Sequence, residues 1–404
     1  MLFRSWFNES LCRLLRNSEP ELRKTIARFM QWCEGADTVK VTQVLLEDAR
    51  KEEDKTTRLN CIRSAGYTLY AARLIHKTDE SISTDLTEIE DYLSDKDEDI
   101  RNAAACALAC VYRDDENRLS RLEEKLPGAE TIMWASIESV SDDAALWKKD
   151  DYHEKTVKQL TDWLLEQQGS KRFMLIDKLL AEAKNFLLEE TEEFNKAETL
   201  TKVEYSPREH GVVTSVLSEL TEHMTYKGFT REMSIEEVLD LFVRAAGNTS
   251  SWITRRGGIR ALGNLQQFTG KVARAFFEAC QDVKKVYSEA RRAVGKFKRF
   301  DEESLAILTK AIEHPGIRVA HNAALLLGEL GMSRSEELGI KGRQQVAEAL
   351  LNILHTPAAE RIIYDFTDNE EGKRIGPLYD VLYDSLVRVI AGPDSAAVIK
   401  EEEK

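Results

Sequence analysis

The sequence predicts an all-α fold, an α–α superhelix (solenoid) of helical hairpins that stack along the chain. Two observations predict it. Glycine recurs near the end of amphipathic segments at Gly263, Gly295 and Gly328, at intervals of 32 and 33 residues. With only seven prolines, 42% apolar and 32% charged residues, the composition suits many helices with one buried and one solvated face. A period of this length is typical of arrays in which each repeat is one hairpin.

Each repeat glycine lies in a helix that follows another amphipathic segment. The glycine-bearing segments, expected as inner helices, are residues 254–265, 286–297 and 319–331. The preceding segments, expected as outer helices, are residues 238–246, 272–283 and 305–312. Apolar residues in the outer segments recur at i, i+3, i+4 and i+7, which is the period of one helix face.

Glycine inside a helix is less favourable than alanine by about 0.5–1 kcal/mol, so its recurrence needs a reason. We expect the missing Cβ to let a neighbouring backbone approach closely, and the stacking gained to exceed this cost. Alternatively, the glycines only end the helices as C-caps. The apolar pattern continues past the glycine, at Leu265 and Leu330, which favours close packing.

The segment HPGIRVAHNAALLLGELG, residues 314–331, resembles HEAT-type repeats, especially the short bacterial HEAT-like variety with an inner helix of the form VRxxAAxALGxL. Residues 57–70, which keep Gly66, match more loosely, as do residues 97–111, which have Ala109 where glycine is expected. The resemblance is strong over 234–331 and moderate over 41–112. It implies a HEAT-like α-solenoid, a fold whose inner helices commonly bind other proteins.

We expect four parts along the chain. These are N-terminal helical repeats with a capping helix (1–112), an irregular helical segment (113–233), the best-matching repeats (234–331), and C-terminal capping helices with an acidic tail (332–404). In the last part, helices are expected over 346–355 and 378–390, with a charged loop near FTDNEEGKRIGP between them. The first helix, with Trp6 and Phe7 on a broad apolar face, either caps the first hairpin or lies on a membrane surface. We favour the cap, because Asn8 and Glu9 do nothing to favour lipid.

The net charge of −14 excludes a surface that binds nucleic acid or membrane over its whole extent, so any such binding is local. The six cysteines lie far apart without a CxxC motif, which fits reduced thiols. No uncharged run reaches the roughly 18 residues of a membrane span. Arg4 interrupts the N-terminal apolar stretch, unlike a secretory signal. We expect a soluble cytoplasmic protein without a membrane partner.

Catalytic motifs such as HExxH, GxSxG, the Walker loop and GxGxxG are absent from the sequence. We therefore expect no enzyme activity, no catalytic residue, no metal and no cofactor. The cluster DDYHE at 150–154 is expected as a polar loop rather than a metal site. Cys106 and Cys110 are four residues apart on an inner helix, but no matching pair lies nearby, so we expect small packing residues.

The clearest functional signal is a basic band over residues 251–300, where twelve cations face three anions in an acidic chain. Arg260 and Arg292 each stand three residues before a repeat glycine, so we expect them on adjacent inner helices as an anion clamp. Alternatively, the cations pair with acidic neighbours such as Glu236, Glu237, Asp301, Glu302 and Glu303 on a solvated face. The candidate binding residues are Arg255, Arg256, Arg260, Lys284, Lys285, Arg291, Arg292, Lys296, Lys298 and Arg299.

The function expected first is a non-enzymatic scaffold, or the regulatory part of a larger assembly, whose inner helices bind a protein partner while the basic band engages an acidic segment. The alternative is nucleic-acid binding, in which residues 255–299 grip phosphates as in the HEAT-like alkylpurine DNA glycosylase group. The acidic remainder of the chain then favours a short or single-stranded ligand. A third alternative is a HEAT-type lyase, resembling the phycobilin lyases, or a glycosylase-like enzyme.

Overall fold

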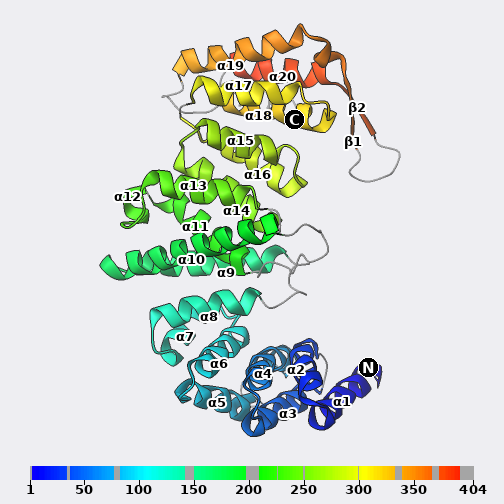
Figure 1. Cartoon of the computed structure of the whole chain (residues 1–404), viewed down its shortest axis with the longest axis vertical. Coiled ribbons are helices and arrows are strands. Elements are labelled where there is room, and N and C mark those ends of the chain that lie inside the picture. The colour runs from blue at the N-terminus through cyan, green and yellow to red at the C-terminus, as the bar shows by residue number, and fades with distance from the viewer. Residues whose placement is uncertain are drawn as a thin grey trace. The chain divides into compact units, whose positions relative to one another are not determined.

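The structure is a computed structural model. It describes residues 2–33, 37–76, 82–141, 150–196, 209–224, 226–248, 251–298, 300–332, 339–365 and 373–391. The described residues form mainly α-helices, which confirms the predicted fold class. They divide into two compact units, Met1–Glu166 and Gln167–Lys404 (Figure 1). Each unit is a stack of helical hairpins, and the boundary between the units falls inside the segment 113–233.

In the N-terminal unit the described helices form four hairpins and one further helix. The first helices are α1 (Leu2–Asn17), α3 (Thr38–Lys51), α5 (Ser83–Asp91) and α7 (Arg118–Lys125). The second helices are α2 (Pro20–Phe29), α4 (Lys55–His76), α6 (Glu98–Val111) and α8 (Ala129–Ser141). Each second helix packs on the next one, α2 on α4, α4 on α6 and α6 on α8. The final helix, α9 (Asp150–Glu166), packs on α7 and α8.

The pair α4 and α6 illustrates how the sequence builds this stack. The carboxylate of Asp97 accepts a hydrogen bond from the amide of Asp99 at 2.9 Å and starts α6. A Cβ on Gly66 would lie 2.5 Å from the Cα of Ala107, so the two backbones touch where a larger residue does not fit. Cys106 and Cys110 are buried beside Tyr67, which confirms their predicted role as packing residues.

In the C-terminal unit the described helices form five hairpins. The first helices are α10 (Gly169–Lys196), α13 (Ile235–Ala246), α15 (Gly270–Ala279), α17 (Glu302–Ile312) and α19 (Gly339–Leu354). The second helices are α11 (Glu209–His223), α14 (Trp252–Leu265), α16 (Lys284–Val294), α18 (Ile317–Gly331) and α20 (Leu378–Ala391). The short helix α12 (Tyr226–Phe229) lies between α11 and α13. First helices pack on first helices and second helices on second helices, which makes two rows (Figure 1).

The repeat glycines have two different roles. A Cβ on Gly263 would lie 2.6 Å from the Cβ of Ala293, and one on Gly328 would lie 2.9 Å from the Cβ of Ser385. Close packing is therefore confirmed at these two positions. It is wrong for Gly295, where the nearest atom beyond the helix is 3.8 Å away. Gly295 ends α16 as its C-cap, the alternative that the sequence also allowed.

The charged segment before the last helix differs from the expected loop. After a 3₁₀ helix over Pro357–Glu360, strand β1 (Ile362–Asp365) pairs antiparallel with β2 (Lys373–Pro377), with Ile362 opposite Pro377. Two isoleucines and a tyrosine favour extended backbone in β1. The guanidinium of Arg361 donates to the carbonyl oxygens of Ile312 and His314, at 2.5 and 2.6 Å, and ties this segment to the end of α17.

The first helix buries only part of its apolar face. Cys12 and Leu15 are buried and α1 packs on α2 and α3, as a capping helix requires. Trp6, Phe7 and Leu14, however, remain largely exposed.

No helix in the described ranges is both long enough and apolar enough to span a membrane. The sequence EEEK at the C-terminus, predicted as an acidic tail, lies outside these ranges.

Candidate functional site

Helix α14 carries the first part of the basic band, and three glycines fix its position. Gly257 faces Thr214 of α11, and Gly258 faces the backbone of α13, where a Cβ would lie 2.6 Å from the amide nitrogen of Ala246. Gly263 faces α16, as described above. The hydroxyl of Ser251 accepts a hydrogen bond from the amide of Thr254 at 3.3 Å and caps the helix start. The segment TRRGGIRALGNL therefore places α14 in close contact with three helices.

The core of the basic band is a buried carboxylate shared by three arginines. Glu289 of α16 has a side chain that is 5% exposed. Its Oε2 atom accepts hydrogen bonds from Nε of Arg256 and from Nη2 of Arg260, each at 3.2 Å, and lies 3.7 Å from Nη2 of Arg292. Arg260 also donates from Nη1 to Oε2 of Glu219 on α11 at 2.9 Å. Arg260 and Arg292 thus come together as the repeat register predicts, and the anion between them is the protein's own.

The charges of this cluster hold Glu289 ionised. Burial raises the pKa of Glu289, but the hydrogen bond from Arg260 and the charges of Arg260 and Arg292 outweigh burial, so its pKa is lowered from the ordinary value. Burial lowers the pKa of Arg260, whereas its contacts with Glu289 and Glu219 raise it, and the net direction is upward. The cluster therefore stays charged across the neutral pH range.

Other members of the band also pair with acidic residues. Arg255 binds Asp282 through both carboxylate oxygens, one of them at 2.8 Å, and donates to the carbonyl of Asn248 at 2.9 Å. Arg291 joins α16 to α18 through Glu329 at 2.7 Å. Lys296 donates to Oδ1 of Asn264 at 2.7 Å and lies 3.4 Å from Glu222. The cations therefore pair with acidic residues, as the alternative interpretation of the band expected. The acidic residues are different from the neighbours that the sequence suggested.

The sequence missed most of these acidic partners. Glu219, Glu222 and Glu329 belong to other hairpins, and of the neighbours proposed from the sequence, Glu303 forms an ion pair, with Arg274 at 2.9 Å. Apart from Arg292 and Glu289, which lie on one helix, the pairs join residues separated by 27 to 74 positions. The signal that could have found many of them is the repeat period itself, because residues about one repeat apart lie on adjacent rungs.

Of the candidate binding residues, four remain exposed. Lys284, Lys285 and Lys298 are exposed, and the side chain of Arg292 is 62% exposed despite its contact with Glu289. The ammonium of Lys285 lies 4.6 Å from the ring centre of Trp252, a cation–π contact that orients it on the surface. Lys298 lines a hollow of about 520 Å³ with Gln266, Gln267 and Asp301, between the loops that precede α15 and α17. Arg299 lies outside the described residues.

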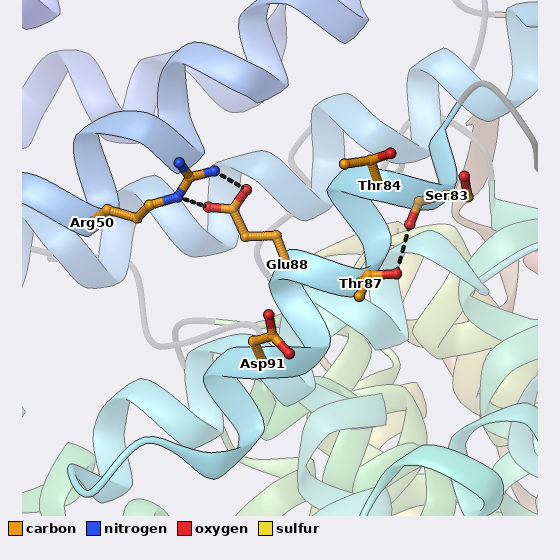
Figure 2. A pocket seen from close by; sticks show the side chains of 6 residues that line it. All are labelled: Arg50, Ser83, Thr84, Thr87, Glu88 and Asp91. Atoms are coloured by element: carbon orange, nitrogen blue, oxygen red, sulfur yellow. Dashed lines mark hydrogen bonds and ion pairs between the residues drawn. The ribbon is translucent and has the colours of Figure 1, made fainter.

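A second hollow, also of about 520 Å³, lies between α3 and α5 in the other unit. Figure 2 shows its lining residues, among them Arg50 of α3 and Glu88 of α5. The guanidinium of Arg50 donates to both oxygens of Glu88, so the cation of this hollow is already bound. Asp91 adds a further carboxylate. The residues that line this hollow therefore include no free cation that could bind an external anion.

The described residues hold no group of three or more side chains that could bind a metal ion. Residues 150–154, expected as a polar loop, begin α9 instead, and the side chains of 150–153 lie outside the described set. The six cysteines are free and buried. Burial raises the pKa of Cys33, Cys61 and Cys280 to about 12, which is unsuited to a nucleophilic thiolate.

The fold and the basic band define a helical-repeat solenoid with charged second helices. No protein-family model matches the chain, and no curated protein matches it. Among solved structures, it is similar to an engineered protein with a TM-score of 0.37 and 14% identity, covering 95% of this chain and 98% of that one.

It is also similar to Kap95p, from a structure with RanGDP, and to importin beta. The TM-score is 0.40 in both cases, with 10% and 12% identity, covering 95% and 97% of this chain. This chain matches 45% of each of those two longer chains. The fold class follows from the rows of helical hairpins. Structural similarities with TM-scores of 0.37 to 0.40 are too low to support it.

Proposed function

We propose that the chain is a non-enzymatic HEAT-like scaffold that binds an acidic segment of a protein partner through the row of second helices, at α14 and α16. The observation that supports this most is that four of the candidate cations have exposed side chains, Lys284, Lys285, Arg292 and Lys298. The six free cysteines fit the predicted cytoplasmic location, which is part of the proposal.

The spacing of these cations suits an extended acidic peptide. Lys285 and Arg292 are seven residues apart on α16, so they lie on one face about 10 Å apart along the axis. In an extended peptide, carboxylates two residues apart lie on one face about 7 Å apart, a separation that the long side chains of Lys285 and Arg292 can match. In this arrangement Arg256 and Arg260 do not bind the partner. They hold Glu289 and fix the backbone that presents Arg292.

The same contacts favour an acidic peptide over nucleic acid. Arg255, Arg256, Arg260 and Arg291 are engaged by carboxylates, and Glu219, Glu222 and Glu329 lie beside the cations. A duplex would need many unpaired cations along its backbone and would meet these carboxylates. Phosphate binding by residues 255–299 is retained as an outcome of the test.

The test is a binding titration by fluorescence anisotropy, with a labelled oligoglutamate peptide and a labelled oligothymidine of equal charge. The variant Lys284→Glu with Lys285→Glu changes exposed cations on α16. The matched control is Lys271→Glu with Arg274→Glu, which makes the same change in charge on α15, where both side chains are about two-thirds exposed.

We expect the peptide to bind more tightly than the oligonucleotide, and the α16 variant to lose about tenfold or more in affinity while the α15 variant changes little. Tighter binding of oligothymidine, lost in the same α16 variant, would replace the peptide by nucleic acid. Equal losses in the two variants would show that only net charge matters and would refute the site.

A further inference from the structure

A hollow lies where helices α14 and α16 end, next to the cations of the proposed binding site. Lys296 comes four residues after Arg292 and donates to Oδ1 of Asn264, near the end of α14, at 2.7 Å. Lys298 follows two residues later and lines the hollow of about 520 Å³ described above, which we call the loop hollow. The exposed cations of α16 are therefore continuous with the loop hollow through Lys296 and Lys298.

Gln266, which lines the loop hollow, has a backbone conformation that favours glycine. It is the C-cap of α14, with a φ angle of 58° and a ψ angle of 23° in the left-handed region. Of the residues that the structure describes, it is the one residue other than glycine with a positive φ angle. Glycine adopts this conformation without steric cost and is common at such helix ends. Strained backbone of this kind clusters at functional sites, and the turn itself does not explain an amide side chain here.

Two side-chain amides in the loop hollow have hydrogen-bonding capacity that the fold does not use. Those of Gln266 and Gln267 hydrogen-bond to no other residue in the part of the chain that the structure describes. The hydroxyl of Thr269, which also lines the hollow, does not cap the helix α15 that it precedes. An amide both donates and accepts hydrogen bonds, as the main chain of a peptide does, so these groups suit a peptide ligand.

The lining of the loop hollow is neutral overall and partly apolar, unlike the face of α16. Its charged residues are Lys298 and Asp301, one of each sign. Asp301 is held in place because its carboxylate accepts a hydrogen bond from the amide of Ser304 at 2.7 Å and caps α17. Leu265 and Phe300 are half-buried and leave apolar surface at the hollow. An acidic residue of a ligand would lie beside the carboxylate of Asp301, whereas an apolar residue would contact Leu265 and Phe300.

We propose, building on the function proposed above, that the loop hollow binds one uncharged apolar residue of the partner that adjoins the acidic segment on α16. In this arrangement the amides of Gln266 and Gln267 hydrogen-bond to the main chain of the partner at that residue, and its side chain contacts Leu265 and Phe300. The volume of about 520 Å³ lies within the roughly 300–1,000 Å³ of ligand sites. The partner's motif is therefore an acidic run next to an apolar residue.

The experiment measures the affinity of the full chain for two peptides by fluorescence anisotropy. One is oligoglutamate with a leucine at each end, and the other is the same oligoglutamate with a serine at each end. Both have blocked termini and carry the dye in the middle of the peptide. The leucine peptide should bind about tenfold more tightly, because burying about half of one leucine side chain corresponds to roughly that factor.

Two variants remove the amides without harming the fold. Gln266→Gly should leave the melting temperature unchanged or slightly higher, because glycine favours the left-handed backbone, and Gln267→Ala changes an exposed side chain. Each should reduce the gain from leucine to about threefold or less, while the serine peptide binds as it does to the wild type. The matched control Gln281→Ala changes an exposed loop glutamine that does not line the hollow and should keep the full gain.

The outcomes separate this proposal from the one on which it rests. If the wild type binds both peptides with equal affinity, the loop hollow takes no apolar residue and the acidic site on α16 stands alone. A tenfold gain that persists in both Gln266→Gly and Gln267→Ala would place the leucine elsewhere and would also overturn the proposal. Absence of binding by either peptide would refute the acidic site itself, and the loop hollow with it.

Discussion

The contact between Gly263 and Ala293 gives the most direct prediction about stability. In Gly263→Ala the new Cβ would lie 2.6 Å from the Cβ, 2.9 Å from the Cα and 3.0 Å from the carbonyl oxygen of Ala293. Two of these three atoms belong to the backbone, so a side-chain rotation cannot remove the clash. Helices α14 and α16 must therefore move apart by about 1 Å to reach an ordinary contact distance.

The size of the effect follows from two opposing terms. Overpacking of this kind is destabilising by about 1–3 kcal/mol, and the better helix propensity of alanine returns about 0.5–1 kcal/mol. We expect a net loss of about 1–2 kcal/mol in the free energy of unfolding. At about 2–4 °C per kcal/mol for a unit of this size, the melting temperature should fall by about 2–8 °C.

The chain supplies its own control one repeat later. At Gly295 the nearest atom beyond the helix is the carbonyl oxygen of Glu329 at 3.8 Å, and the φ angle of −69° is open to any residue. Gly295→Ala should leave stability unchanged or raise it by up to about 1 kcal/mol. Urea unfolding followed by circular dichroism measures both variants. Equal losses at the two positions, or a gain at 263, would refute the packing argument.

Two further predictions concern buried carboxylates. Asp85 is buried, and burial together with the charge of Glu88 raises its pKa from 3.8 to about 6. Because the folded pKa is above the unfolded one, its stabilising contribution is full below pH 3.8 and is lost as the pH rises through about 6. Asp85→Asn should therefore be more stable than the wild type at pH 7 by at most about 3 kcal/mol, with the gap closing in acid; a gap independent of pH would contradict this assignment. Glu289→Gln should lose about 1–3 kcal/mol near neutral pH, because Arg256 and Arg260 lose a charged partner, and the lowered pKa of Glu289 means that the loss shrinks as the pH falls through that pKa. Denaturant titrations at several pH values measure both, and a stability of Glu289→Gln equal to that of the wild type at pH 7 would show that the cluster does not hold the helices.

The sequence predicted the hairpins best where the period was visible. The segments 254–265, 286–297 and 319–331 became α14, α16 and α18, because apolar periodicity and repeat spacing both reflect the stacking that forms them. The hairpins α7/α8 and α10/α11 lack that spacing, and their residues were expected as an irregular segment. The prediction of close packing was wrong at Gly295 because glycine is favoured both at a helix end and at a close helix contact. The sequence alone does not distinguish these two roles.

For the basic band, the sequence predicted which helices carry the cations but not which cations have exposed side chains. The repeat period correctly placed Arg260 and Arg292 on adjacent second helices, α14 and α16. It could not reveal that Glu289 lies between them, because a single buried carboxylate looks like any other acidic residue in the sequence. Pairing across hairpins, as between Arg260 and Glu219, depends on side-chain directions that the period leaves open. Lys284, Lys285 and Arg292 are therefore chosen as the proposed binding residues because their side chains are exposed, and not because the band has many positive charges.

Lysine footprinting tests the proposed binding site most directly, because it needs no substitution. The protein is acetylated briefly with and without an excess of the oligoglutamate peptide, and each lysine is quantified by mass spectrometry. Lys284 and Lys285 should lose reactivity when the peptide is present, while Lys271, which is exposed on α15, should keep it. Equal protection of all three lysines, or protection of Lys271 alone, would contradict a binding site on α16.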